Sequence, residues 1–163
     1  MSELISQTPI WVFTIFVILL LLGFIQSKER IVKIKSIFIL PTAMIIFSFF
    51  GVYSAFGFTL SNISFWTAGL LLPLIFGIKL AHPKLVNFSE EHNKLTIPGS
   101  WVPFILMMAI FFTKYFVGYS IARELAIVNE FMFVVTISIL YGIFSGIFLS
   151  RSFVMFNARK ASV

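Results

Sequence analysis

Residues 131–150 read FMFVVTISILYGIFSGIFLS, a run without a charged residue that decides the class of fold. About 20 apolar residues are enough for an α-helix to cross the hydrocarbon core of a bilayer. Small residues recur in this run at every fourth position: Ser138, Gly142, Gly146 and Ser150. Lipid gives helices no hydrophobic reason to associate, so a stripe of small side chains favours close packing of backbones. We therefore expect a transmembrane helix with one tightly packed face. Two partners fit that face, another helix of the same chain and the same helix of a second copy, and we favour the first.

The same criterion finds four more spans, at residues 9–25, 37–56, 63–80 and 101–122. The chain has 163 residues, of which 60% are hydrophobic and 11% are charged. A soluble domain would have about a quarter of its residues charged, so too little polar sequence is present to cover a soluble core. No linker divides the chain. The sequence therefore predicts an all-α membrane protein, a five-transmembrane-helix bundle that forms a single domain over residues 1–163.

The first span is expected to be a membrane helix and not a cleaved leader. Only Glu3 precedes it among charged residues, and no small-residue cleavage site follows it.

The positions of the basic residues predict how the chain is threaded. Ten of the 12 Lys and Arg residues fall in the loops at 26–36 and 81–100, at the adjoining Lys79 or after the last span. Cytoplasmic loops carry an excess of Lys and Arg, which sets the orientation of membrane proteins. We expect the N-terminus outside, the C-terminus in the cytoplasm and both loops on the cytoplasmic side. The same rule explains the net charge of +6 without a nucleic-acid partner.

Pro41 and Pro73 fall inside the second and third predicted spans. A proline in a helix removes one backbone hydrogen bond and predicts a bend. The freed carbonyl groups either line a polar cavity or are satisfied by neighbouring helices, and the sequence favours the second alternative.

Lys114 stands in the apolar stretch FFTKYFVGYS at residues 111–120. It precedes the end of the fourth span by eight residues, about 12 Å at 1.5 Å per residue, so it lies in one leaflet and not at the centre. Two interpretations are open. The lysine extends to the headgroups beside the interfacial Tyr115 and Tyr119, or it faces the bundle interior and lines a wet cavity.

The second interpretation predicts a binding site for an anionic or polar solute around Lys114. Glu130, at the start of the last span, is a candidate counter-charge, as is Glu124. Thr136 and Tyr141 in the last span are candidate polar lining residues.

Several chemistries are not expected. The chain has no cysteine, which removes disulfides, thiolate nucleophiles and Cys-ligated metals. His82, Glu90, Glu91 and His92 match no metal signature and are interpreted as a solvated loop. The spans contain no His, Asp or Glu and no nucleophile–base pair. We expect no catalytic residues, no metal, no cofactor and no enzymatic activity.

Three stretches carry a resemblance: QTPIWVF (7–13), LPTAM (40–44) and PGSWVPFILMMAIFFTKY (98–115). Together they resemble a family of small bacterial inner-membrane proteins of unknown function. The resemblance implies a multi-pass protein of the bacterial cytoplasmic membrane and a compact helical bundle. It implies no activity, cofactor or site residue.

Two function classes follow from these features. The first is a small transporter or channel-like protein for a small anionic or polar solute, bound near Lys114, with two copies if five helices enclose too little space. The alternative is a membrane-embedded interaction protein, such as an accessory subunit, assembly factor or immunity-type protein, which binds a membrane-protein partner through its glycine stripe. Of these two classes, we favour the transporter or channel-like protein.

Overall fold

The computed structural model describes residues 9–80, 87–89 and 94–158. Five helices in this part of the chain are long and apolar enough to cross a membrane. They are α2 (Ile10–Ser27), α3 (Ile39–Phe56), α4 (Leu60–Leu80), α5 (Val102–Ala122) and α6 (Phe131–Ala158). The prediction of an all-α bundle of five membrane-spanning helices is confirmed, and the chain is a multi-pass membrane protein.

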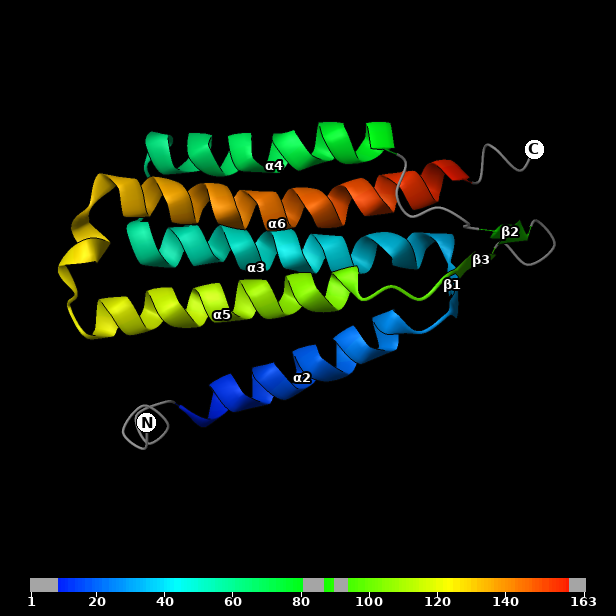
Figure 1. Ribbon diagram of the computed structural model, residues 1–163, viewed down its shortest axis with the longest axis horizontal. Coiled ribbons are helices and arrows are strands. Elements are labelled where there is room, and N and C mark those ends of the chain that lie inside the picture. The colour runs from blue at the N-terminus through cyan, green and yellow to red at the C-terminus, as the bar shows by residue number, and fades with distance from the viewer. Residues whose placement is uncertain (1–8, 81–86, 90–93, 159–163) are drawn as a thin grey trace.

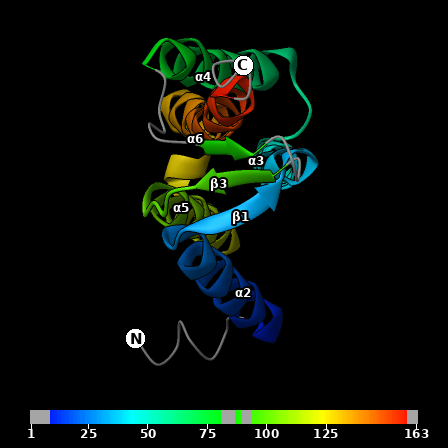
Figure 2. The ribbon, with the colours of Figure 1, turned by 90° about the vertical axis from the view of Figure 1, so that its right-hand side faces the viewer.

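The helices lie roughly along one long axis, and from top to bottom of the view they follow the order α4, α6, α3, α5 and α2 (Figure 1). α6 packs most extensively against α4 on one side and then against α3 on the other, while α2 packs against α5 at the far edge. The end view shows the same succession from α4 to α2 (Figure 2). The start of α2 and the end of α6 lie at opposite ends of the bundle.

The small stripe of α6 lies against α4 of the same chain. A Cβ atom added at Gly142 would collide with the backbone oxygen of Trp66, and one added at Gly146 would collide with the backbone oxygen of Leu70. The contact is reciprocal, because a Cβ atom at Gly69 of α4 would strike the carbonyl group of Ile139. Ser138 and Ser150 are buried, and Gly77 packs on Ser150. Absent side chains thus let two helix backbones touch, as the stripe predicts.

A polar link joins three helices beside this contact. The indole Nε1–H of Trp66 in α4 donates to the hydroxyl of Ser48 in α3 at 2.8 Å. That hydroxyl donates to the backbone oxygen of Tyr141 in α6 at 2.9 Å. Ser48 is fully buried, so the two hydrogen bonds fix the register of α3 and α4 on α6.

A small sheet lies at one end of the bundle, where only loops were expected. Strands β1 (Arg30–Lys33), β2 (Asn87–Ser89) and β3 (Lys94–Ile97) form an antiparallel sheet in the order β1-β3-β2. The loops expected at 26–36 and 81–100 are therefore partly paired with each other. We call this the sheet end of the bundle.

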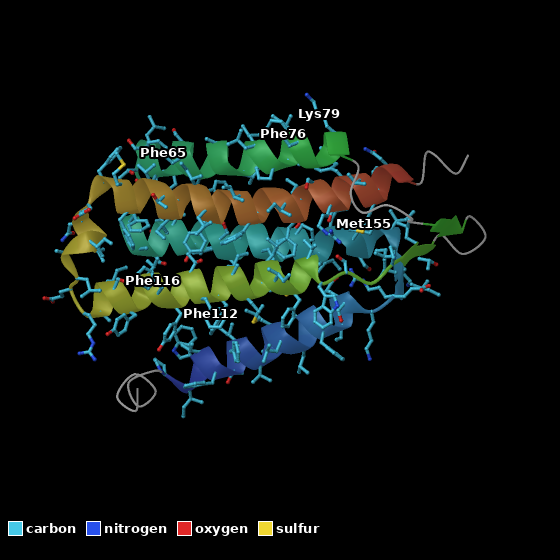
Figure 3. All side chains as sticks on the ribbon, in the orientation of Figure 1. Phe65, Phe76, Lys79, Phe112, Phe116 and Met155 are labelled. Atoms are coloured by element: carbon cyan, nitrogen blue, oxygen red, sulfur yellow. The ribbon has the colours of Figure 1, made fainter. Side chains whose placement is uncertain are left out.

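Leu95 and Ile97 of β3 are buried in a small core, separate from the one between the helices. Ile34, Ile37 and Met155 complete that cluster, and Met155 is seen near the sheet at the end of α6 (Figure 3). A Cβ atom at Gly99 would strike the backbone of Ser27, and the Ser100 N–H donates to the backbone oxygen of Gln26 at 3.2 Å. The sheet and its connection therefore hold the end of α2 beside the start of α5.

The two prolines differ in position. Pro73 lies inside α4, as predicted. Pro41 instead falls in the first turn of α3, because the chain before Ile39 forms a 3₁₀ helix, η1 (Ile34–Phe38). The first-turn N–H groups of an α-helix have no partner within it, so Pro41 does not interrupt the helix interior.

Candidate functional site

A cavity of about 620 Å³ lies between α2, α3, α5 and α6 near the end of the bundle opposite the sheet. We call it the Lys114 cavity. α5 lines it with Lys114, Val117, Gly118 and Ile121, which have the spacing of a single helix face. Phe47, Gly51, Ser54 and Ala55 of α3 also line it with helical spacing. The remaining described lining residues are Pro9, Trp11, Val12, Ile15, Phe111, Tyr115, Tyr119, Ala122, Arg123 and Tyr141.

Lys114 contributes a positive charge to this cavity. Its Nζ atom lies 4.3 Å from the centre of the Phe47 ring on the neighbouring α3. An aromatic face attracts a cation, and the attraction strengthens where water is excluded. Within the described residues, no carboxylate pairs with the ammonium group. The side chain is thus directed towards the neighbouring helix α3.

Tyr141 forms the floor of the cavity. Its side chain is fully buried, and its hydroxyl oxygen has no hydrogen-bond partner among the described residues. The ring fits against Gly51, where a Cβ atom would lie 3.1 Å from Cζ of the ring. Buried hydroxyl groups nearly always have a hydrogen-bond partner. The Tyr141 hydroxyl has none among the described residues, so it can donate to a solute at the boundary of the cavity.

Arg123 gives the cavity a second positive charge at its mouth. It caps the end of α5, and its guanidinium carbon lies 5.7 Å from the centre of the Tyr119 ring. None of the described lining residues is Asp or Glu. The cavity is therefore apolar over most of its wall and cationic at two points.

The structure brings together only part of the predicted site. Lys114 and Tyr141 line the same cavity, whereas Thr136 and Glu130 do not. Thr136 is exposed on α6, and Glu130 is exposed just before that helix. Neither Glu130 nor Glu124 forms an ion pair with Lys114. The proposed counter-charge and one proposed polar lining residue thus lie away from the cavity.

Phe47, Gly51 and Arg123 line the cavity but were not predicted from the sequence as site residues. Gly51 had a usable signal, since an interior glycine in a helix indicates close approach of another group. Phe47 had none, because it is one of 22 phenylalanines and its contact with Lys114 depends on how α3 faces α5.

The predicted loop residues His82, Glu90, Glu91 and His92 lie outside the described residues. Among residues 9–80, 87–89 and 94–158, no group of three or more His, Cys, Asp and Glu could hold a metal ion.

The family profile described as a family of unknown function (DUF6622) matches residues 1–162, and the chain belongs to that family. No curated protein and no solved structure matches the chain significantly.

Proposed function

We propose that this member of a family of unknown function is a small transporter or channel-like protein that binds an anionic solute in the Lys114 cavity. The main support for this proposal is the positive charge of the cavity lining. Lys114 and Arg123 are the cationic residues, and none of the described lining residues is Asp or Glu. A cation removed from bulk water interacts strongly with an anion. Charged residues within membrane spans commonly mark solute pathways.

The volume and the apolar lining of the cavity indicate which class of anionic solute it fits. The volume of about 620 Å³ falls within the range of roughly 300–1,000 Å³ typical of small-molecule sites. Most of the lining is apolar, with aromatic rings from Trp11, Phe47 and Phe111. A carboxylate attached to an apolar group matches both the positive charge and the apolar wall of the cavity. Its carboxylate group would lie at Lys114, where it could also accept a hydrogen bond from the Tyr141 hydroxyl.

We further propose that the protein resides in the bacterial cytoplasmic membrane with the sheet end in the cytoplasm. The basic residues of β1 and the adjoining Lys28 gather at that end, and Lys79 lies at the same end of α4 (Figure 3). Under the positive-inside rule, the Lys114 cavity then opens towards the outer side.

The alternative, an interaction protein, was based on binding of a partner through the glycine stripe of α6. The glycine stripe of α6 is covered by α4, so a partner protein would need a different face. We also propose no enzymatic activity, because the described lining residues of the cavity include no His, Asp, Glu or Cys to act as a base.

Thermal unfolding of the purified protein in a neutral detergent tests the binding step. Octanoate and benzoate are suitable probes, with octanol and benzyl alcohol as uncharged counterparts. We expect the carboxylates alone to raise the unfolding temperature. Lys114→Met should weaken their apparent affinity about tenfold or more, the effect of losing roughly 1.4 kcal/mol of binding free energy.

Lys79→Met is the matched control, because Lys79 is exposed and does not line the cavity. It should respond to the carboxylates as the unaltered protein does. Electrical current across planar bilayers that contain the protein would then show whether the bound carboxylate crosses as an anion, because the neutral acid that crosses lipid unaided carries no current. Equal stabilisation of the Lys114→Met and unaltered proteins would exclude the Lys114 cavity as the site.

A further inference from the structure

A second, smaller cavity lies at the sheet end, on the far side of the helix core from Lys114. Its volume is about 230 Å³, and it is lined by β1, η1, β3 and the adjoining parts of α2, α3, α5 and α6. Two arginines reach it from separate elements, Arg30 from β1 and Arg151 from α6. We call it the arginine cavity.

The two guanidinium groups are half-buried and close enough to repel each other. Within the described residues, neither has a carboxylate partner, although Glu29 is adjacent to Arg30 in sequence. Partial burial removes part of the solvation of the Arg30 guanidinium group and thereby lowers its pKa. Two like charges brought together away from bulk water destabilise the fold unless an anion lies between them.

The uncharged lining adds groups that can contact such an anion. The side-chain oxygen of Gln26 is buried and has no hydrogen-bond partner in the described part of the chain. A half-turn of this amide would present its NH₂ group instead. The hydroxyl groups of Ser36 and Ser100 lie on the same lining. A buried polar atom that has no partner among the described residues, on the same cavity as two guanidinium groups, points to a site for a polar ligand.

We infer that the arginine cavity is a binding site for a phosphate group, held between Arg30 and Arg151. The planar guanidinium fork binds phosphate oxygens through paired N–H groups. The cavity is smaller than typical sites for drug-sized molecules, so it suits an inorganic phosphate ion or the headgroup of one anionic phospholipid. The two sources share this chemistry, and basic pockets between membrane helices on the cytoplasmic side bind anionic headgroups.

Thermal unfolding in neutral detergent, with two probes, tests the inference. The first arm adds inorganic phosphate and compares it with chloride at equal ionic strength. The second arm adds dihexanoyl phosphatidylglycerol and compares it with dihexanoyl phosphatidylcholine, both below the micellar concentration. Stabilisation in the first arm identifies a free phosphate ion as sufficient. Stabilisation in the second arm alone identifies a lipid headgroup. Both results support the site.

Arg30→Gln and Arg151→Gln should each weaken the apparent affinity for the effective probe about tenfold or more. Lys33→Gln is the control, because Lys33 is also in β1 but is exposed and does not line the cavity. Arg30→Lys keeps the charge and loses the fork, so it should show an intermediate loss. It also serves if either glutamine variant fails to fold.

A second readout follows from the repulsion between the arginines. Without any probe, Arg30→Gln should unfold at the same or a higher temperature than the unaltered protein, because one of two like charges is gone. Stabilisation by neither probe, or an equal response in the arginine variants and Lys33→Gln, would overturn the inference. Lys114→Met leaves this cavity intact and should respond normally, which separates the test from that of the proposed function.

Discussion

At the scale of single residues, polar groups inside the bundle fall into two kinds, satisfied and unsatisfied. Ser48 belongs to the first kind, since it connects Trp66 to the backbone of α6. Tyr141 belongs to the second, since its buried hydroxyl group has no hydrogen-bond partner among the residues that the structure describes. Removing the Ser48 hydroxyl should lower the stability of the folded state. Removing the Tyr141 hydroxyl should raise that stability or leave it unchanged.

Ser48→Ala should destabilise the protein by about 1–3 kcal/mol, the cost of leaving a buried donor without its acceptor. The donor is the indole N–H of Trp66. Ser64→Ala on the exposed face of α4 is the control, because its hydroxyl bonds only to Leu60 one turn earlier in the same helix. Reversible unfolding in mixed micelles measures both free energies. Equal values for the two variants would show that the link contributes nothing.

Tyr141→Phe should raise the unfolding temperature of the ligand-free protein or leave it unchanged, because a buried hydroxyl without a partner costs free energy. The same variant should bind octanoate less tightly if that hydroxyl donates to the solute. Tyr53→Phe is the matched control, since Tyr53 is 50% exposed. A marked loss of stability in ligand-free Tyr141→Phe would contradict the unsatisfied state of this group.

At the scale of the helices, the contact between α4 and α6 depends on glycine. Gly142→Ala or Gly146→Ala should destabilise the protein by about 1–3 kcal/mol, as overpacking does in well-packed cores, because each new methyl group meets the α4 backbone. Gly118→Ala on α5 meets nothing within 4 Å. It should be neutral or stabilise its helix by about 0.5–1 kcal/mol. Unfolding midpoints of the three ligand-free variants compare these effects, and equal shifts would exclude the steric cause.

Sequence patterns predicted the helices better than their arrangement. Each span was predictable because the thickness of the bilayer sets the length of an apolar run. The position of α6 between α4 and α3 was not, because side chains that face lipid are as apolar as those that face the core. The stripe at Gly142 and Gly146 indicated tight packing but not its partner. Lys114 and Tyr141 were predictable as rare polar groups, whereas Phe47 needed the tertiary structure.

The strands of the sheet were missed for a different reason. They are three or four residues long, which is too short for a strong alternating pattern. A weak signal existed in β3, where Leu95 and Ile97 are buried and the intervening Thr96 is partly exposed. Alternation of this kind is typical of a strand with one buried face.

At the scale of the whole molecule, the bundle has two basic cavities at opposite ends and an apolar core between them. The Lys114 cavity and the arginine cavity share no lining residue. Met107, Ile110 and Phe144 are buried in the main core between the helices. Packed apolar side chains therefore separate the two cavities in the described part of the chain.

Orientation in the membrane is a prediction at this scale. The chain has no native cysteine, so single-cysteine variants carry no background labelling. Lys33→Cys at the sheet end and Asn129→Cys at the opposite end are both exposed. A membrane-impermeant maleimide added to intact cells should label Asn129→Cys only, and both should react in opened membranes. Labelling of Lys33→Cys in intact cells would reverse the orientation.

The most direct measurement on the central claim asks whether water and anions reach position 114 inside the bundle. Lys114→Cys is treated in intact cells with anionic methanethiosulfonate ethylsulfonate, beside Phe112→Cys on α5, where the native side chain is 56% exposed and does not line the cavity. A wet cavity that admits anions predicts rapid modification at position 114 and little at position 112. Equal rates at the two positions, or no reaction at 114, would contradict the cavity.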